Sequence, residues 1–181
     1  MNTSVFKPVL NQIHNDAIRE FTIACLKDCP DYLLEIPASN SNKYHPVRAR
    51  KEGGLVWHIL RCCHIANIYF NSYQFTNEDI RGDIVLSALL LHDIGKKQKY
   101  NNYWEYKNHP LTSSKMVAKH KKMLPEKIFK TIQNCIIFHM GPWTPHSVKK
   151  DINKYNLLEL IVYNSDYFSS IPELKLNTKD K

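Results

Sequence analysis

The sequence predicts an all-α protein folded as a helical bundle. Apolar residues recur at spacings of three and four in several segments, which is the period of an amphipathic helix, and no segment shows a convincing β-strand pattern. Residues 84–91 are apolar on nearly every side, as expected of a helix buried at the centre of a bundle. At 181 residues the chain suits one domain, which we expect to span residues 1–181 and to bury about 70% of the unfolded surface.

The other elements follow from the same periodicity. A first helix is expected over residues 5–29, where apolar residues share one face and Pro30 ends the helix. Residues 30–53 contain three prolines and several Asn and Ser residues, which indicates a long loop. Further loops are expected over 95–108 and 141–145. The remaining expected helices cover residues 55–73, 76–94, 110–122, 125–139 and 154–169.

The composition is that of a basic protein without membrane segments. The chain has 25 Lys and Arg residues against 17 Asp and Glu, a net charge of +8, which favours anionic ligands without naming one. No run of 18 apolar residues suggests a membrane span, and the N-terminus lacks the pattern of a secretory signal. We therefore expect a cytoplasmic protein with no membrane partner and no obligate protein partner.

The five cysteines do not form a pattern typical of a disulfide framework or a zinc knuckle, because no Cys-x-x-Cys pair is present. Cys62, Cys63 and Cys135 fall on apolar faces of expected helices. A free thiol in such a place usually packs as a small hydrophobic side chain. We expect that role for these three residues.

One stretch of the chain requires more than a structural explanation. A buried leucine run, residues 89–91, leads directly into His92 and Asp93, and Lys96 follows after one helical turn. Burying a charged group costs free energy unless the group is paired or bound to a metal. His92 and Asp93 therefore need partners from elsewhere in the chain.

Four other segments offer partners at the ends or core-facing turns of expected helices, namely His58, His109, His139 and Asp166. Each has a plain explanation when taken alone: Asp93 could pair with Lys96, for example, and Asp166 could cap a helix. Together they have the donor types of a dinuclear metal site built between helices of a bundle. The remaining histidines considered, His14, His64, His120 and His146, are expected to lie at the surface or to form ordinary hydrogen bonds.

Over residues 53–168 the chain resembles the HD superfamily of metal-dependent phosphohydrolases, whose fold is an all-α bundle. The order of the motif, His…His-Asp…His…His…Asp, is similar to the dinuclear branch of that superfamily. The segments that carry the resemblance are Gly53-Gly54-Leu55-Val56-Trp57-His58, Leu90-Leu91-His92-Asp93-Ile94-Gly95-Lys96, Asn108-His109-Pro110, Phe138-His139-Met140-Gly141 and Tyr163-Asn164-Ser165-Asp166-Tyr167.

The resemblance implies two divalent cations, with Mn, Fe, Ni, Co, Zn and Mg all open as the metal. One metal would be held by His58, His92, Asp93 and Asp166. The second would be held by Asp93, His109 and His139, so that the Asp93 carboxylate bridges the two metals. Cations roughly 3.5–4 Å apart can lower the pKa of a shared water and bind the oxygens of a phosphate during in-line attack. The implied reaction is phosphoester hydrolysis, with Asp93 and Lys96 as catalytic residues.

Several residues are candidates for substrate binding. Lys96 could neutralise a phosphate in the transition state or simply pair with Asp93. Trp143, in the segment 141–145, could stack on a nucleobase or pack its own loop. Arg48, Arg50 and Lys51, which precede the glycine pair, could line the entrance or remain solvated charges.

The resulting hypothesis is a metal-dependent phosphohydrolase or phosphodiesterase that acts on a nucleotide or a nucleic-acid 3′ end, so that its partner is a phosphorylated small molecule or an oligonucleotide. The glycine pair followed by His58 is similar to the HD domain of bacterial 3′-5′ exoribonucleases. The arrangement of His109, His139 and Asp166 also looks like that of bacterial dinucleoside-tetraphosphate hydrolases. Two alternatives remain, a di-iron oxygenase with the same ligand set and a non-catalytic module that binds nucleotides.

Overall fold

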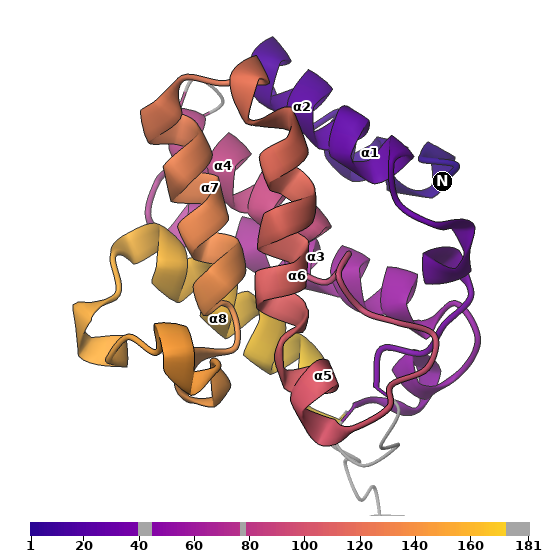
Figure 1. Cartoon of the computed structure of the whole chain (residues 1–181). Helices are drawn as coiled ribbons and strands as arrows, with labels where there is room; N and C mark the ends of the chain where they lie inside the picture. The colour runs from indigo at the N-terminus through magenta and orange to yellow at the C-terminus, as the bar shows by residue number, and fades with distance from the viewer. Residues whose placement is uncertain (40–44, 77–78, 173–181) are drawn as a thin grey trace, which may run out of the picture.

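The computed structural model describes residues 1–39, 45–76 and 79–172, and these residues form a bundle of helices without any strand (Figure 1). The predicted all-α fold class is therefore confirmed. Within the described part of the chain, no helix combines the length and the apolar character needed to cross a membrane. The α-helices are α1 (Lys7–Leu10), α2 (Asp16–Lys27), α3 (Gly54–Ser72), α4 (Ile80–Leu91), α5 (Tyr103–Lys107), α6 (His109–Val117), α7 (Glu126–Phe138) and α8 (Leu157–Ser170).

Helix α4 forms the centre of the bundle. It packs against α2, α3, α7 and α8, and in Figure 1 it lies behind α6 and α7. The side chains of Leu89, Leu90 and Leu91 are completely buried. This agrees with the expectation that a segment apolar on nearly all sides forms a central helix.

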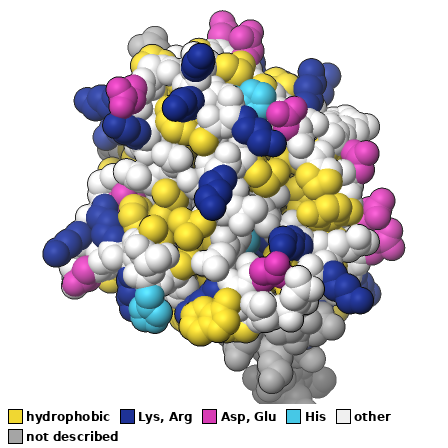
Figure 2. All heavy atoms as spheres, in the orientation of Figure 1, with side chains coloured by type: hydrophobic (Ala, Val, Ile, Leu, Met, Phe, Trp, Pro, Cys, Tyr) yellow, Lys and Arg dark blue, Asp and Glu magenta, His cyan; other side chains and the backbone are white. Residues whose placement is uncertain are grey.

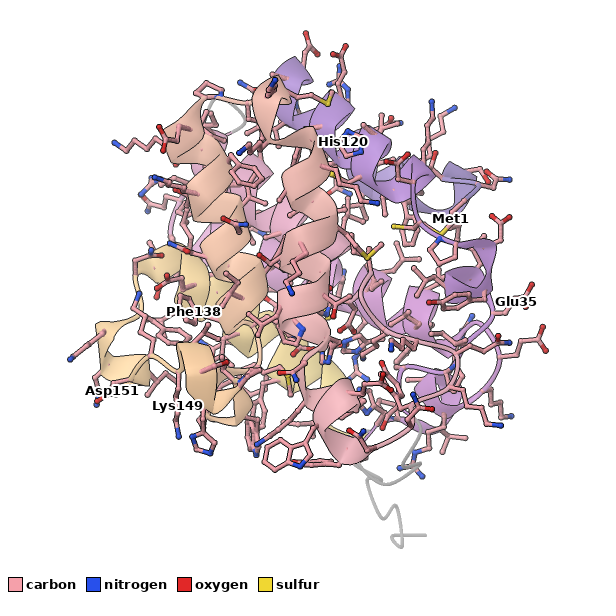
Figure 3. All side chains as sticks on the ribbon, viewed as in Figure 1. Met1, Glu35, His120, Phe138, Lys149 and Asp151 are labelled. Carbon is pink, nitrogen blue, oxygen red and sulfur yellow. The ribbon has the colours of Figure 1, made fainter. Side chains whose placement is uncertain are left out.

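The N-terminal segment packs onto the same core. Phe6, Leu10 and Ile13 belong to the hydrophobic cluster that includes the leucines of α4. The ammonium group of Met1, which is labelled in Figure 3, donates hydrogen bonds to the carbonyl oxygens of Lys27 and Cys29 at 2.9 and 3.0 Å. These bonds fix the N-terminus to the end of α2.

The prediction of one continuous helix over residues 5–29 is wrong. The chain forms a 3₁₀ helix and the short α1, and then leaves helical geometry before α2 begins. Two interactions explain the break. The buried carboxylate of Asp83 accepts hydrogen bonds from the backbone N–H groups of His14 and Asn15, at 3.0 and 2.7 Å, and the Asn15 side chain caps α2 by accepting from Ile18 N–H.

The two segments predicted as long loops also contain short helices. Residues 30–53 include the 3₁₀ helices Asp31–Leu34 and Val47–Arg50, while residues 40–44 lie outside the described part of the chain. The segment 95–108 contains α5, because the Asn102 side chain accepts a hydrogen bond from Glu105 N–H and so caps a new helix. Sequence periodicity misses helices as short as these.

The central helix ends earlier than predicted, at Leu91 instead of residue 94. The hydroxyl of Ser113 in α6 donates to the carbonyl oxygen of His92 at 2.7 Å and accepts from Gly95 N–H at 2.8 Å. These contacts replace the hydrogen bonds of a continuing helix. They also hold the His92-Asp93 pair against the start of α6.

Gly95 should be essential for this contact. A Cβ atom at Gly95 would lie 2.5 Å from Ser113 N and 2.6 Å from His109 O, whereas a Cβ at Gly82 in α4 would meet nothing closer than 3.8 Å. We expect Gly95→Ala to lower the free energy of unfolding by about 1–3 kcal/mol. Gly82→Ala should be neutral or should stabilise by about 0.5–1 kcal/mol, because it replaces glycine within a helix. Urea denaturation of both variants checks this, and equal stability of the two would contradict it.

Candidate metal centre

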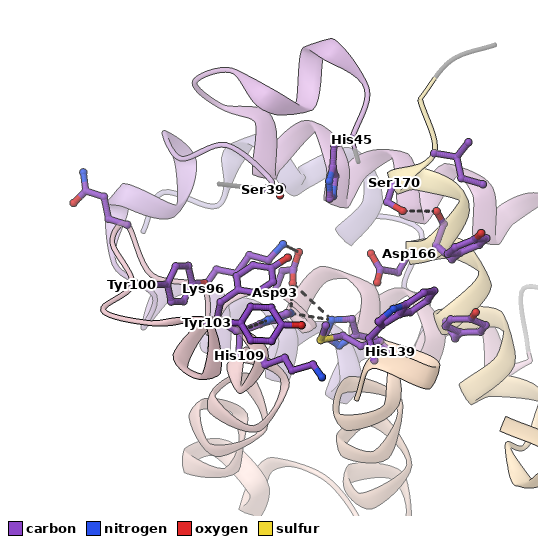
Figure 4. A pocket seen from close by; sticks show the side chains of 18 of the residues that line it. Ser39, His45, Asp93, Lys96, Tyr100, Tyr103, His109, His139, Asp166 and Ser170 are labelled. Atoms are coloured by element: carbon purple, nitrogen blue, oxygen red, sulfur yellow. Dashed lines mark hydrogen bonds and ion pairs between the residues drawn. The ribbon is translucent and has the colours of Figure 1, made fainter. Parts of the chain in front are cut away.

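A cavity of about 1040 Å³ opens where the ends of α4 and α7 meet the start of α6 and the last turns of α8 (Figure 4). Asp93, His109, His139 and Asp166 are among the residues that line it. His58 and His92 lie beside this wall and are fully buried. The structure thus brings all six predicted ligands together.

Each of these side chains is positioned by a helix. His58 lies in the second turn of α3, and Asp166 faces it from α8. His92 and His139 occupy the positions that immediately follow α4 and α7, and His109 is the first residue of α6. Because these helix ends meet at one place in the bundle, residues far apart in the sequence become neighbours.

Three of the histidines share one hydrogen-bond pattern. The Nδ1 atoms of His92, His109 and His139 each lie 2.7–2.8 Å from the carbonyl oxygen of the residue three positions earlier. A carbonyl oxygen only accepts hydrogen bonds, so Nδ1 carries the proton and, in the neutral ring, Nε2 carries the free lone pair. Imidazoles that bind metals are commonly oriented in this way.

His58 is oriented by a side chain instead of a carbonyl group. Its Nδ1 lies 3.0 Å from Ser169 Oγ, and the Ser169 hydroxyl also contacts the carbonyl oxygen of His58 at 3.2 Å. If the hydroxyl donates to that carbonyl, it accepts from Nδ1–H of the ring. The Nε2 atom of His58 then faces the carboxylates in the same way as the Nε2 atoms of the other three histidines.

The two oxygens of Asp93 face different histidines. Oδ2 lies 3.3 Å from His92 Nε2 and 3.7 Å from His58 Nε2. Oδ1 lies 3.0 Å from His109 Nε2 and 3.8 Å from His139 Nε2 (Figure 4). The carboxylate therefore separates the four imidazoles into two pairs, one on each oxygen.

Asp166 completes the first of these two groups. Its Oδ1 atom lies 3.0 Å from His58 Nε2 and 3.7 Å from His92 Nε2. Cys62, one turn after His58 in α3, brings its Sγ atom to 3.6 Å from His58 Nε2 and lies within the same group of possible donors. All five cysteines are buried, and burial raises the pKa of the Cys62 thiol well above its ordinary value.

The chemistry of these donors fits divalent cations. His92 Nε2 is buried and has no hydrogen-bond partner within the described residues. The Nε2 atoms of His109 and His139 lie only 3.1 Å apart, so their lone pairs repel unless a proton or a cation lies between them. Nitrogen and carboxylate donors of this kind suit Zn, Fe, Mn, Co and Ni. His58, His92, Asp93 and Asp166 could hold one ion, and Asp93, His109 and His139 a second.

Electrostatics also favours cations at this place. Burial raises the pKa of the Asp93 carboxyl, but His92 and Lys96 outweigh it and hold that pKa well below its ordinary value. The pKa of Asp166 is likewise low, since the hydrogen bond to His58 and nearby imidazoles outweigh burial. Burial lowers the pKa of His92, but the negative charge of Asp93 outweighs this and raises it overall. The same negative charge would attract a metal ion.

Lys96 lies against the candidate centre. Its ammonium group is buried, 2.7 Å from Asp93 Oδ2, and donates to the carbonyl oxygen of Ala38 at 2.8 Å. Burial lowers the pKa of Lys96, but Asp93 more than compensates and raises it, so the amine remains charged. The ion pair considered from the sequence is therefore present, and Lys96 also lines the cavity.

The other predicted substrate-binding residues fall into two groups. Trp143 lines the cavity, is half exposed and stacks on Tyr167 with ring centroids 6.0 Å apart. Arg48, Arg50 and Lys51 are not in the lining formed by the described residues. The Arg50 guanidinium instead donates a hydrogen bond to the carbonyl oxygen of His45.

Sequence reasoning missed His45, which is buried and lines the cavity. It also missed the aromatic residues of the wall, among them Tyr100 and Tyr106. The signal for His45 was weak, a histidine before a proline within a long loop ahead of the glycine pair. Loops of that length are often functional, but sequence spacing does not show which of their residues turn inward.

The glycine pair explains how this loop reaches the cavity. Gly53 has a positive φ of 70°, and a Cβ atom at Gly54 would lie 2.2 Å from the carbonyl oxygen of Ala49. The Ala49 carbonyl also accepts a hydrogen bond from Ala38 N–H at 2.8 Å. Glycines at 53 and 54 thus allow residues 45–50 to pack directly onto the start of α3, close to His58.

Metal content should follow this geometry. We expect the parent protein, loaded with Mn²⁺ and freed of excess metal, to retain two equivalents. His139→Ala should retain about one, whereas Asp93→Ala should lose both because its two oxygens face both groups. Elemental analysis measures the content, circular dichroism checks folding, and His64→Ala, an exposed residue of α3, serves as the control. Parent-like metal content in His92→Ala and Asp93→Ala would contradict the assignment.

The metal-free protein should lose stability in acid. Burial lowers the pKa of His139 from 6.5 to about 3, so between these values the unfolded chain binds a proton that the folded protein does not. The free energy of unfolding then falls as the pH decreases, by up to about 1.4 kcal/mol per pH unit for this group. The raised pKa of His92 acts in the opposite direction and offsets part of the loss.

Urea denaturation of EDTA-treated protein between pH 7 and pH 4 measures this slope. His139→Phe should flatten the curve only in part, because it removes one titrating group while His58 and His45, whose pKa values burial also lowers, remain. His146→Phe, at an exposed position, should leave the curve unchanged. An identical slope in His139→Phe and the parent would show that His139 does not cause the loss.

Comparison with known proteins agrees with the fold and the motif. The model of the HD domain matches residues 56–171, which is more than half of the chain. No curated protein and no solved structure shows significant similarity to the chain. The chain therefore belongs to the HD-domain family, whose domains bind divalent metals and whose members are mostly metal-dependent phosphohydrolases.

Proposed function

We propose that this protein is a phosphohydrolase or phosphodiesterase that uses two divalent cations to hydrolyse a phosphoester of a nucleotide or of a nucleic-acid 3′ end. The observation that carries the proposal is the division of the Asp93 carboxylate between two pairs of imidazoles. A carboxylate in this position can bridge two cations. Membership of the HD-domain family supports the reaction class.

The residues of the site would have different roles in such a reaction. Divalent cations held by these residues would supply an activated water and would withdraw charge from the phosphate oxygens. The four histidines hold fixed positions, because their Nδ1 atoms are bonded to backbone carbonyl groups or to Ser169. Asp93 is held by the imidazoles around it and by Lys96. The Lys96 ammonium, a buried cation facing the cavity, offsets the negative charge that develops on the phosphoryl group.

The cavity wall supports a substrate that joins phosphate to an aromatic base. Trp143 and Tyr167 present stacked rings to the cavity, and Tyr163 stacks on Tyr167 at 6.0 Å. Lys99 and Lys107 line the same cavity. Aromatic faces stack on nucleobases and basic side chains attract phosphates. On the face shown in Figure 2 the basic side chains are scattered among acidic and hydrophobic ones. We therefore infer the kind of ligand from the residues that line the cavity and not from this outer face.

An activity screen tests the proposal. Protein loaded with Mn²⁺, Ni²⁺ or Co²⁺ is incubated with nucleotides, cyclic dinucleotides and short oligonucleotides, and released phosphate or nucleotide is measured. We expect hydrolysis that EDTA abolishes. Asp93→Asn should fall to background, and Lys96→Met should lose about 10²–10³-fold in kcat, the usual cost of removing a group that stabilises transition-state charge.

Lys97→Met is the matched control, because Lys97 is the next residue but pairs with Glu105 outside the cavity lining. It should keep parent activity. Failure to cleave any member of the panel, or full activity in Asp93→Asn, would refute the proposal. Iron-dependent O₂ consumption by anaerobically purified protein, without phosphate release, would instead support the oxygenase alternative. Nucleotide binding without either activity would support the regulatory one.

A further inference from the structure

Cys62 lies inside the candidate metal centre, although it is not one of the six ligands that the motif implies. It follows His58 by one turn of α3, so the two side chains share a face of that helix. Its Sγ atom lies 3.6 Å from His58 Nε2. The ligand atoms of this group, which also includes His92 and Asp166, all lie within 4.8 Å of one another. The sulfur is therefore placed among the donors that could hold the first cation.

Packing alone does not account for this position. Cys62 and the next residue, Cys63, are both buried in the hydrophobic cluster, but among the described residues Cys63 belongs to neither group of possible metal donors. A second observation concerns His92, whose buried Nε2 atom has no hydrogen-bond partner within the described residues. Buried polar atoms are rarely left unpaired, which points to a ligand at the place where these donors meet.

The distances between these atoms fit a single cation. In a tetrahedral site with metal–nitrogen bonds of about 2.0–2.1 Å and a metal–sulfur bond of about 2.3 Å, the nitrogen and the sulfur lie about 3.5–3.6 Å apart. Cys62 Sγ and His58 Nε2 are 3.6 Å apart. For a nitrogen and a carboxylate oxygen the same geometry gives about 3.3–3.5 Å. Asp166 Oδ1 lies 3.0 and 3.7 Å from the Nε2 atoms of His58 and His92, on either side of that range.

The two groups of donors differ in their access to the cavity. Cys62, His58 and His92 are fully buried, and they are absent from the cavity lining formed by the described residues. Asp166 connects this inner group to the cavity, because it belongs to the lining and its side chain is 20% exposed. The three residues of the second group all line the cavity. An inner cation would thus be enclosed by protein donors, whereas an outer one keeps positions open, as catalytic metal sites do.

We propose that Cys62 binds the first cation through its sulfur and makes this inner site selective for Zn²⁺ over Mn²⁺ and Mg²⁺. On binding, the S–H bond breaks, a metal–sulfur bond forms and the proton passes to the solvent. Thiolate ligands favour Zn²⁺, whereas carboxylate and water ligands suit Mg²⁺ and Mn²⁺. The proposal rests on the metal centre of the proposed function and not on the identity of the substrate.

Cobalt spectroscopy tests the metal–sulfur contact directly. Metal-free protein in a reducing buffer is titrated with Co²⁺, and the near-ultraviolet absorption of thiolate-to-Co²⁺ charge transfer is measured. The parent should show this band, since Co²⁺ accepts the same kinds of ligand as Zn²⁺. Cys62→Ala should lose the band. Cys63→Ala, the matched control at the neighbouring buried cysteine, should keep it.

Metal affinity separates coordination from packing. Competition with a chromophoric chelator gives the affinities for Zn²⁺ and for Mn²⁺. In Cys62→Ala the affinity of the tighter site for Zn²⁺ should fall at least about 10–100-fold, because the loss of a residue that only orients a ligand already costs that much. The affinity for Mn²⁺ should stay within about 3-fold of the parent, because a hard cation gains little from sulfur. A cysteine that only packs the core would weaken both metals equally.

Three results would overturn the proposal: a parent without the charge-transfer band, a band that persists in Cys62→Ala, or equal losses of Zn²⁺ and Mn²⁺ affinity in that variant. Circular dichroism checks that the variants fold. If Cys62→Ala does not fold, X-ray absorption by the Zn²⁺-loaded parent decides the matter without a variant. A sulfur neighbour at about 2.3 Å from the metal is expected, and its absence would refute the ligand.

This proposal and the proposed function can fail separately. A protein that shows the Cys62-dependent band but hydrolyses no phosphoester would refute the proposed function and retain the ligand. An active hydrolase whose Co²⁺ form lacks the band would refute the ligand alone. A parent protein that binds no divalent cation would overturn both.

Discussion

The Asp93 carboxylate is the group on which the rest of the site depends. It is buried at the end of the central helix, with one oxygen facing His58 and His92 and the other facing His109 and His139. A buried carboxylate is costly unless cations or hydrogen-bond donors surround it. In this bundle the ends of α4, α6 and α7 and the faces of α3 and α8 meet around Asp93, and they place imidazole rings next to its carboxylate.

The hydrogen bonds around Asp93 also determine the local backbone. The central helix ends at Leu91, where the Ser113 hydroxyl donates to the carbonyl oxygen of His92 and accepts from the N–H of Gly95. Lys96 then turns back onto Asp93 and onto the backbone of Ala38, which joins the loop before α3 to the centre. Ala38 N–H also donates to the carbonyl oxygen of Ala49, so the segment 45–50, which brings His45 to the cavity wall, is linked to the same part of the backbone.

Much of the fold was predictable because long segments with the apolar period of a helix do form helices in the folded protein. The segments that form α3, α4, α7 and α8 were expected within a few residues of their observed bounds. One failure occurred where a distant polar group competes with the local helix, since Asp83 breaks the first helix at His14 and Asn15. The other was local: Asn102 caps α5 within a predicted loop, and five residues are too few to show an apolar period.

By itself the sequence determined the helical fold class and the six candidate ligands, since periodicity and the motif are local properties of the chain. Only the tertiary structure decided how the oxygens of Asp93 are divided, that Arg50 supports His45 instead of lining the cavity, and that His45 forms part of the cavity wall. These features depend on distances between atoms from separate helices and loops. Such distances are determined by how the helices pack, and they cannot be inferred from the order of residues in the sequence.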